Sequence, residues 1–418
     1  MEYKSYNCKA YNIHTVKTDK FKTVRMEIVF RREVKKEDMQ AYTFLCDLMS
    51  DVSKMYPKRR DMVIKLEELY KAYFYATTNK VGNLFTISFC YEFIDPIYIN
   101  EDNYLEEVIK FPFEVIKNPN VENNEFDLVA FNNVKRRMKS GIEGLRENPI
   151  KYAINAAFKN MDKNSPTSYR VTGDLEGLNK ITRENLYNYY LELLNSTCDI
   201  FVIGNLDMDK TVQIIKKNFD YNVISTDKYE IDIVNKERKK PLVVKEKLDF
   251  VQSTLVMIFN INGLDEKDKL FSFHVFNYIF GDGGISSKLY QKIRVDKSYC
   301  YSIRSMYLKY DNLLLITTSL DNENVENTKK LVIECLNDMA SGNFGEDDIV
   351  DAKKNLILSL KMALDNNYAI MNNLEFKVFS ELPLPEERVE FIQNVSKEDV
   401  MRVAKKIKLN TVFVLESK

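Results

Sequence analysis

Two residues whose side chains suit substrate binding, Arg294 and Tyr301, stand seven positions apart in the second half of the chain. A guanidinium and a phenol are fixed hydrogen-bond donors, which can hold a substrate carbonyl and stabilise charge that grows on its oxygen. On residue type alone, a surface arginine and a half-buried tyrosine are the commoner interpretation. The pair therefore becomes a candidate substrate-binding site only if its surroundings support that role.

Histidine and cysteine limit the metal chemistry that the chain can perform. His14 and His274 are the two histidines of the sequence, and they lie far apart, so no single helix can supply two imidazoles to a zinc ion. The six cysteines are scattered and form no CxxC pair, which argues against a zinc knuckle or a disulfide framework. We expect reduced thiols and no metal or other cofactor in this chain.

The glycine-rich stretch Gly281–Gly284, GDGG, has two interpretations. It could be a phosphate-cradling loop, but the GxxxxGK[ST] pattern is absent and no strand leads directly into it. A turn between two helices that requires a positive φ angle explains the glycines better.

Composition excludes several classes of partner. The 418 residues include 61 Lys and Arg against 62 Asp and Glu, a formal net charge of −1, so no global field attracts nucleic acid or an anionic membrane. No apolar run approaches the roughly 20 residues that span a bilayer, and the N-terminal stretch lacks the apolar region of a signal peptide. We expect a soluble, cytoplasmic protein with no nucleic-acid or membrane partner.

The pattern of apolar residues predicts the same order of elements twice, namely strand, two helices, strand and helix. Each copy is closed by a further helix and strand. Both closing helices begin with a hydroxyl N-cap, Thr182 or Ser396, and carry a polar residue at the third helical position, Asn185 or Asp399. The predicted elements of the first copy are residues 24–30, 36–53, 60–76, 84–93, 103–116 and 181–207, and those of the second are 253–260, 266–281, 286–294, 312–320, 322–340 and 395–417.

This repetition predicts an α+β protein made of two similar domains from an internal duplication. Each domain should be an antiparallel-rich sheet with helices packed on it. The basic, proline-containing stretch KERKKP indicates a linker between the copies. We therefore place an N-terminal domain at 1–235, a linker at 236–247 and a C-terminal domain at 248–418.

Two segments resemble the M16 (pitrilysin/insulinase-type) metallopeptidases. GDGGISSKLYQKIRVDKSYCYS, residues 281–302, is similar to the C-terminal-domain signature of that family, in which an Arg is followed by a Tyr seven residues later. Residues 165–207 resemble the end of the family's first domain. The resemblance implies two LuxS/metallohydrolase-like domains and a substrate-binding role for Arg294 and Tyr301.

The zinc motif of the family, HxxEH, is not kept. Aligned on Phe44, Leu45 and the Tyr56–Pro57 turn, the histidine positions fall on Thr43 and Asp47 and the position of the catalytic Glu falls on Cys46. The position of the distal Glu ligand falls near Gly141, while Glu143 is two residues out of register. Without imidazoles or the Glu base, we expect no zinc hydrolysis by this chain alone.

The resemblance extends to a non-catalytic branch of the family, the YfmF-type members associated with modification of elongation factor P. It rests on TDKFKT, YPKRRDMVIKLEELYKAYF and GNLFTISF, which begin at residues 18, 56 and 82. It implies a heterodimer with an HxxEH-containing M16 subunit (YfmH-type) that holds the zinc, acting on a peptide substrate. A homodimer in isolation, and an inactive M16-fold scaffold with no part in proteolysis, remain open alternatives.

Overall fold

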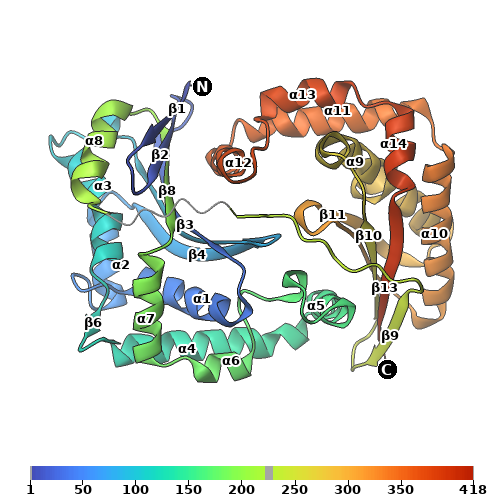
Figure 1. Cartoon of the computed structure of the whole chain (residues 1–418), viewed down its shortest axis with the longest axis horizontal. Helices are drawn as coiled ribbons and strands as arrows, with labels where there is room; N and C mark the ends of the chain where they lie inside the picture. Colours follow the sequence, from blue (N-terminus) through green and yellow to red (C-terminus); the bar gives the residue numbers. More distant parts are fainter. Residues whose placement is uncertain (1, 222–228, 418) are drawn as a thin grey trace. The chain divides into compact units, whose positions relative to one another are not determined.

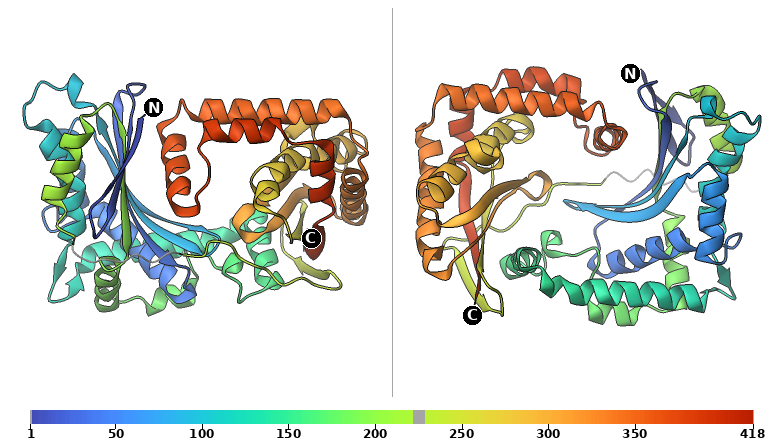
Figure 2. Two further views of the ribbon diagram at one scale, coloured as in Figure 1. Left: turned by 45° about the horizontal axis from the view of Figure 1, so that its top comes forward. Right: turned by 180° about the vertical axis from the view of Figure 1, so that it is seen from behind.

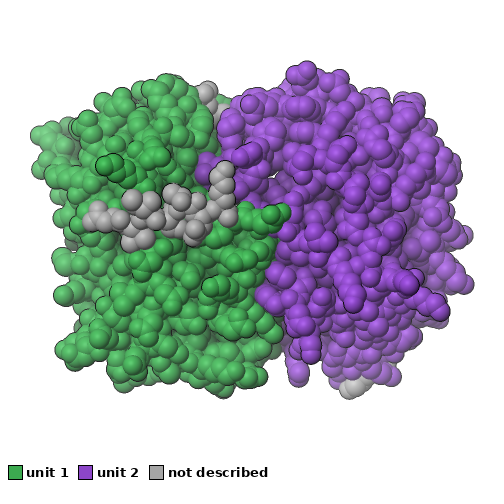
Figure 3. All heavy atoms as spheres, in the orientation of Figure 1, with its two compact units in different colours: residues 1–143, 170–230, 365–375 green, residues 144–169, 231–364, 376–418 purple. Residues whose placement is uncertain are grey.

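The computed structural model describes residues 2–221 and 229–417 and divides the chain into two compact units (Figures 1 and 3). Each unit contains one large, mainly antiparallel sheet with helices packed on it, so the predicted α+β class is confirmed. Within the described residues, no helix combines the length and the apolar character needed to cross a membrane. Unit 1 comprises residues 1–143, 170–230 and 365–375, and unit 2 comprises residues 144–169, 231–364 and 376–418.

Unit 1 is built on a six-stranded sheet. In pairing order its strands are β1 (Glu2–Asn7), β2 (Asn12–Lys17), β8 (Thr197–Gly204), β3 (Thr23–Glu33), β5 (Leu84–Ile94) and β4 (Tyr73–Val81). β2 and β8 run parallel, whereas the other neighbours are antiparallel. β6 (Val121–Glu122) and β7 (Glu125–Phe126) form a separate small hairpin.

The two faces of this sheet differ in polarity because side chains alternate along each strand. On β3, the buried Met26 and Phe30 belong to an apolar face, whereas Arg25, Glu27 and Arg31 point to the other. Helices gather on the apolar face (Figures 1 and 2). They are α1 (Lys36–Asp51), α2 (Arg59–Glu68), α3 (Tyr104–Lys117), α4 (Leu128–Glu143), α6 (Leu175–Lys180), α7 (Arg183–Leu193) and α8 (Met208–Asn218).

Unit 2 has a five-stranded sheet. Its strands, in pairing order, are β9 (Leu242–Lys247), β13 (Ile407–Glu416), β10 (Ser253–Ile261), β12 (Leu313–Leu320) and β11 (Cys300–Leu308). β9 and β13 run parallel, and the other neighbours are antiparallel. Both sheets thus contain one parallel pair followed by antiparallel neighbours, as expected if the two units arose by duplication.

Both faces of the unit 2 sheet are apolar. Leu255 and Met257 of β10 join one core, whereas Val256 and Ile258 of the same strand pack against α5 (Pro149–Met161) on the other face. The small residues of α5, such as Ala157, allow it to lie close to the sheet. The other helices that lie wholly in unit 2 are α9 (Phe273–Asn277), α10 (Val325–Ser341), α11 (Glu346–Ala363), α13 (Pro385–Gln393) and α14 (Lys397–Ala404). α12 (Asn367–Ser380) belongs to unit 1 up to residue 375 and to unit 2 from residue 376.

Two sequence-based expectations differ from the structure. The helix expected to end at residue 76 ends at Glu68, because Tyr70 and Lys71 adopt positive φ angles and the β-branched and aromatic residues that follow form β4. Residues 242–247 of the expected linker form β9, whose alternately exposed side chains suit the edge of a sheet. The predicted domain boundaries themselves remain a prediction.

The two predicted helix caps are confirmed. The Thr182 hydroxyl accepts a hydrogen bond from the Asn185 amide at 3.1 Å, and Ser396 does the same for the Asp399 amide at 3.1 Å. The side chains of Asn185 and Asp399 in turn accept from the cap amides at 2.9 and 2.8 Å. Each capping box satisfies two amides that the first turn would otherwise leave unpaired.

We expect Ser396→Ala to lower the free energy of unfolding by about 1 kcal/mol, because the Asp399 amide loses its acceptor. Ser341→Ala is a matched control, because that hydroxyl only donates back to the carbonyls of Asn337 and Asp338 within its own helix. Urea unfolding followed by circular dichroism measures both variants. Equal midpoints for Ser396→Ala and the wild type would contradict the role of the cap.

Candidate functional site

Unit 2 brings Arg294 and Tyr301 together. Arg294 lies in the π-helical turn Tyr290–Val295, and Tyr301 is the second residue of β11. The centre of the guanidinium is 5.4 Å from the centroid of the Tyr301 ring, a cation–π distance. The structure therefore places the two predicted residues side by side on different elements.

A tight turn produces this arrangement. Ser298 has a φ angle of 56°, and the amides of Ser298 and Tyr299 donate to the carbonyls of Arg294 and Ile293, both at 3.1 Å. These bonds fold the chain back from the helical turn into β11. Upstream, Gly284 has a φ angle of 63° between two helical segments, which confirms the interpretation of GDGG as a turn.

The donor groups of the pair are free to bind another molecule. The Tyr301 side chain is 81% exposed. Across residues 2–221 and 229–417, neither the Arg294 guanidinium nor the Tyr301 hydroxyl has a hydrogen bond or ion pair. The arrangement can present several N–H donors and one O–H donor to a carbonyl or carboxylate oxygen.

The positions predicted to correspond to a zinc site lie on α1 and α4 of unit 1, two helices that pack against each other. Thr43 is occupied by structural contacts. Its hydroxyl is 2.8 Å from the carbonyl of Val171, 2.9 Å from that of Met39 and 2.8 Å from the hydroxyl of Thr78. The hydroxyl thus ties α1 to two neighbouring segments.

Cys46, Asp47 and Gly141 offer little to a metal. Cys46 is buried, and burial raises the pKa of its thiol well above the ordinary value. Burial also raises the pKa of the Asp47 carboxyl, an effect that the nearby Arg137 cation partly offsets. Gly141 on α4 has no side chain, and Arg137 of the same helix makes an ion pair with Asp51 at 2.7 Å.

The structure gives no alternative metal centre among the residues that it describes. No group of three or more His, Cys, Asp or Glu side chains there is arranged to hold an ion. His14 lies on β2 and His274 lies on α9, so neither histidine is part of α1. Burial lowers the pKa of His274 to about 4.

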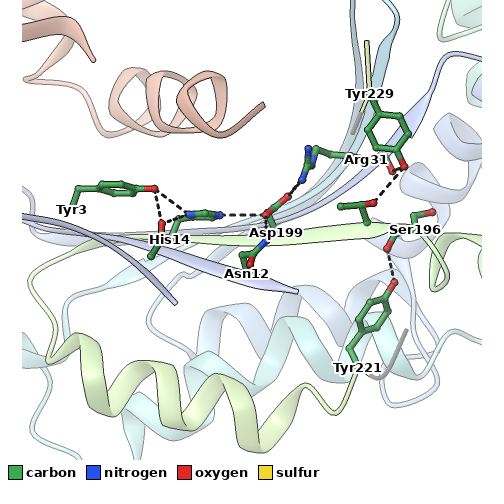
Figure 4. A network of polar contacts seen from close by, with 10 residues as sticks. Tyr3, Asn12, His14, Arg31, Ser196, Asp199, Tyr221 and Tyr229 are labelled. Atoms are coloured by element: carbon green, nitrogen blue, oxygen red, sulfur yellow. Dashed lines mark hydrogen bonds and ion pairs between the residues drawn. The ribbon is translucent and has the colours of Figure 1, made fainter. Parts of the chain in front are cut away.

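A network on the polar face of the unit 1 sheet was not anticipated from the sequence (Figure 4). Asp199 of β8 is fully buried and accepts hydrogen bonds from Asn12 at 3.2 Å and Arg31 at 2.8 Å. Nε2 of His14 is 3.2 Å from Asp199, and its Nδ1 is 2.7 Å from the Ser5 hydroxyl. Because a carboxylate can only accept, Nε2 of His14 is the donor.

This network resembles a Ser–His–Asp relay in composition, yet its contacts favour a structural role. The Asp199 carboxylate is already paired with the guanidinium of Arg31, at 2.7 Å. Burial alone would raise the pKa of Asp199, but the hydrogen bond from His14 and the charge of Arg31 hold it below the ordinary value. Since hydrogen-bonded partners in this network are up to 187 positions apart, only a knowledge of strand order could have revealed it.

A second polar cluster lies on the same face around Arg25. Its guanidinium donates to Glu27 at 2.7 Å and to Tyr75 at 3.3 Å. Within unit 1 it also lies 3.5 Å from the ring centroid of Tyr368, and Asn367 donates to Glu92 at 3.4 Å. Residues 365–375 therefore cover this part of the face.

Comparisons with known proteins agree with the motif analysis. A family model described as "Peptidase M16 inactive domain" matches residues 180–356. The chain is similar to a Bacillus subtilis (strain 168) protein named "Probable inactive metalloprotease YmfF", with 25% identity over 406 residues that cover 96% of this chain and 95% of that protein.

Solved structures show the same architecture. The crystal structure of a conserved protein from Enterococcus faecalis V583 matches with a TM-score of 0.93 and 25% identity, covering 100% of this chain and 99% of that one. A peptidase M16 inactive domain from Pseudomonas fluorescens matches with a TM-score of 0.80, with coverage of 100% and 99%. At 16% sequence identity, this match shows a similar fold and nothing more.

We expect Arg31→Met to destabilise unit 1 by about 3 kcal/mol, because it leaves the Asp199 carboxylate buried without its cation. Adding Asp199→Asn should restore part of this loss, since the orphaned charge is then removed. Urea unfolding at neutral pH measures the single and double variants. A double variant less stable than Arg31→Met would contradict this account.

The same ion pair predicts a pH dependence. The folded pKa of Asp199 is lowered from its ordinary 3.8, so its ionised form contributes stability above that value. This contribution is lost as the pH falls below about 4 and through the lowered pKa. Asp199→Asn should therefore flatten the acid limb of a plot of unfolding free energy against pH, and an unchanged limb would contradict the assignment.

Proposed function

We propose that this chain, an inactive M16-like homologue, is the substrate-binding subunit of a heterodimeric zinc peptidase. In this proposal Arg294 and Tyr301 hold a peptide or peptide-like substrate. A partner subunit of the same family supplies the HxxEH zinc site that this chain lacks.

The observation that carries the proposal is the Arg294–Tyr301 pair. A hydrogen-bonded turn brings the two side chains together. Neither side chain donates a hydrogen bond to any residue that the structure describes. Because Tyr301 is 81% exposed, its hydroxyl is accessible to a ligand. Preorganised donors that face outward are what recognition of a peptide carbonyl requires.

The chemistry of the pair follows from its geometry. The planar guanidinium of Arg294 can donate two parallel N–H groups, and the ring of Tyr301 lies beside it and restricts its orientation. The Tyr301 hydroxyl adds a third donor. Together they would fix a peptide carbonyl and stabilise negative charge as it develops on that oxygen.

Zinc would activate the attacking water in the partner, and the residues of this chain do not fit that task. Thr43 uses its hydroxyl within the fold, Cys46 is a buried thiol, and the partly buried Asp47 has a raised pKa. None supplies an imidazole, the ligand type that the family motif requires. A division of labour between two chains would account for a chain that has the donor pair but has no usable metal position.

A scaffold without any role in proteolysis is the second candidate. Two contacts around α1 favour it: the Thr43 hydroxyl donates to the Val171 carbonyl, and Arg137 forms an ion pair with Asp51. This alternative assigns no function to the free donors of Arg294 and Tyr301. Partner-dependent cleavage distinguishes the two functions.

We expect a mixture of this chain with an HxxEH-bearing M16 subunit from the same genome to cleave a fluorogenic peptide library. Arg294→Ala should lower kcat/KM by roughly 100-fold, because it removes the charged donor group. Tyr301→Phe should lower it by roughly 10-fold through the loss of one hydrogen bond. Cleavage rates with saturating partner measure both effects.

Two exposed residues of unit 1 provide controls. Arg136→Ala removes an exposed guanidinium that donates a hydrogen bond to Asn133 at 3.0 Å, and Tyr98→Phe removes an exposed hydroxyl. Both should leave cleavage unchanged. If the mixture is active and insensitive to Arg294→Ala with Tyr301→Phe, the substrate role is wrong and the scaffold is favoured; if no mixture cleaves, the heterodimeric peptidase is rejected.

A further inference from the structure

A lysine between aromatic rings lies in unit 2, away from Arg294 and Tyr301 in the fold. Lys309 begins a one-turn helix, Lys309–Asp311, that connects β11 to β12. Its Nζ is 4.3 Å from the ring centroid of Tyr310 and 6.0 Å from that of Phe376. The two rings are stacked, with centroids 5.7 Å apart and an interplanar angle of 11°. We call Lys309, Tyr310, Phe376, Lys269 and Arg388 the Lys309 cluster.

The connection that carries Lys309 is held firmly. The carbonyl of Tyr310 accepts from the Ile233 amide at 2.7 Å, and the Tyr310 hydroxyl is 2.6 Å from that of Ser380. The Asp311 carboxylate accepts from the Thr167 hydroxyl at 2.7 Å. The amine and its aromatic walls are thus preorganised, which lowers the entropic cost of binding a ligand.

Charged groups of both signs surround this amine. Lys269 lies 5.5 Å from the Tyr310 ring, but it is neutralised by an ion pair with Asp232 and lies 4.0 Å from Glu266. Lys309 itself makes no hydrogen bond or ion pair with any residue that the structure describes. Arg388 of α13 adds a further positive charge to its surroundings.

The titration of two neighbouring groups reflects this field. Burial, together with the charges of Arg388 and Lys269, lowers the pKa of Lys309 to about 8, although Asp232 and Glu266 oppose the shift. Burial and the charges of Lys309 and Arg388 lower the pKa of His274 to about 4, so this imidazole adds no charge at neutral pH. An anion beside Lys309 would favour the charged form of the amine, which burial and the two cations disfavour.

We propose that the Lys309 cluster is a binding site for an organic monocarboxylate that carries an apolar or aromatic group. The carboxylate would pair with the ammonium of Lys309, and the apolar group would pack on the rings of Tyr310 and Phe376. Asp232 and Glu266 lie in the same surroundings and would repel a dianion such as phosphate. This site is independent of the peptidase proposal, because it uses neither Arg294 nor Tyr301.

Competitive acylation of the full chain with trace acetic anhydride, followed by mass spectrometry of each lysine, tests the proposal. The rate at Lys309 should follow the deprotonation of an amine with a pKa of about 8. Saturating benzoate should raise that pKa, and a rise of one unit lowers the rate at pH 8 about fivefold. Acetate should protect less than benzoate, because it lacks the aromatic group that packs on the rings.

Lys397 is a matched internal control. Its Nζ is 5.0 Å from the Phe344 ring, but it already donates to the Phe344 carbonyl at 2.8 Å and faces Glu346 at 3.9 Å. Its acylation should not respond to benzoate. In direct titrations, Lys309→Met should abolish benzoate binding, Lys309→Arg should retain part of it, and Lys397→Met should leave it intact.

Three results would overturn the proposal. Acylation of Lys309 that benzoate does not slow up to its solubility limit would show that no carboxylate binds there. Equal protection by phosphate would contradict the choice of a monocarboxylate. Benzoate binding that persists in a folded Lys309→Met variant would place the ligand elsewhere.

Discussion

The buried carboxylate of Asp199 joins three strands of unit 1 that the backbone alone connects only in pairs. It accepts hydrogen bonds from Asn12 on β2 and Arg31 on β3, and it is itself part of β8. The hairpin of β1 and β2 is attached to the rest of the sheet through the parallel pairing of β2 with β8. A charge at this point is therefore stable only when all three strands are in register. The polar face of the sheet, with the cluster around Arg25 beside it, depends on that register.

Sequence patterns predicted the repeated order of elements and most of the central strands and helices, because these features depend on local periodicity. The strands in the core of each sheet and the helix caps at Thr182 and Ser396 are encoded within short windows. The edge strands β1 and β9 were missed because their side chains alternate between exposed and partly buried positions, with little apolar signal. Local periodicity also gave no sign that α5 covers the second face of the unit 2 sheet, since that depends on a complementary surface more than 90 residues away in sequence.

The candidate site could be predicted in part for a related reason. Arg294 and Tyr301 are close in sequence, so a known spacing was enough to identify them, and the structure supplied the turn at Ser298 that brings them together. The sequence alignment also identified the positions on α1 that correspond to the zinc motif. It could not predict the contacts that the residues at and near these positions make instead of binding a metal. The contact of Thr43 with Val171 spans 128 positions, and the ion pair of Arg137 with Asp51 spans 86. Such partners follow from tertiary packing alone.

The discontinuity of the two units sets a limit on how the chain can be divided. Cutting at the basic stretch near residue 236 would separate α5 from the apolar sheet face formed by Val256 and Ile258. It would likewise separate Tyr368 from the Arg25 guanidinium in unit 1. Each fragment would then expose a surface that the other normally covers, and the C-terminal one would expose an apolar sheet face prone to self-association. Although their sheets are built alike, the two halves of the sequence are therefore interlocked, because neither half contains all the segments of one unit.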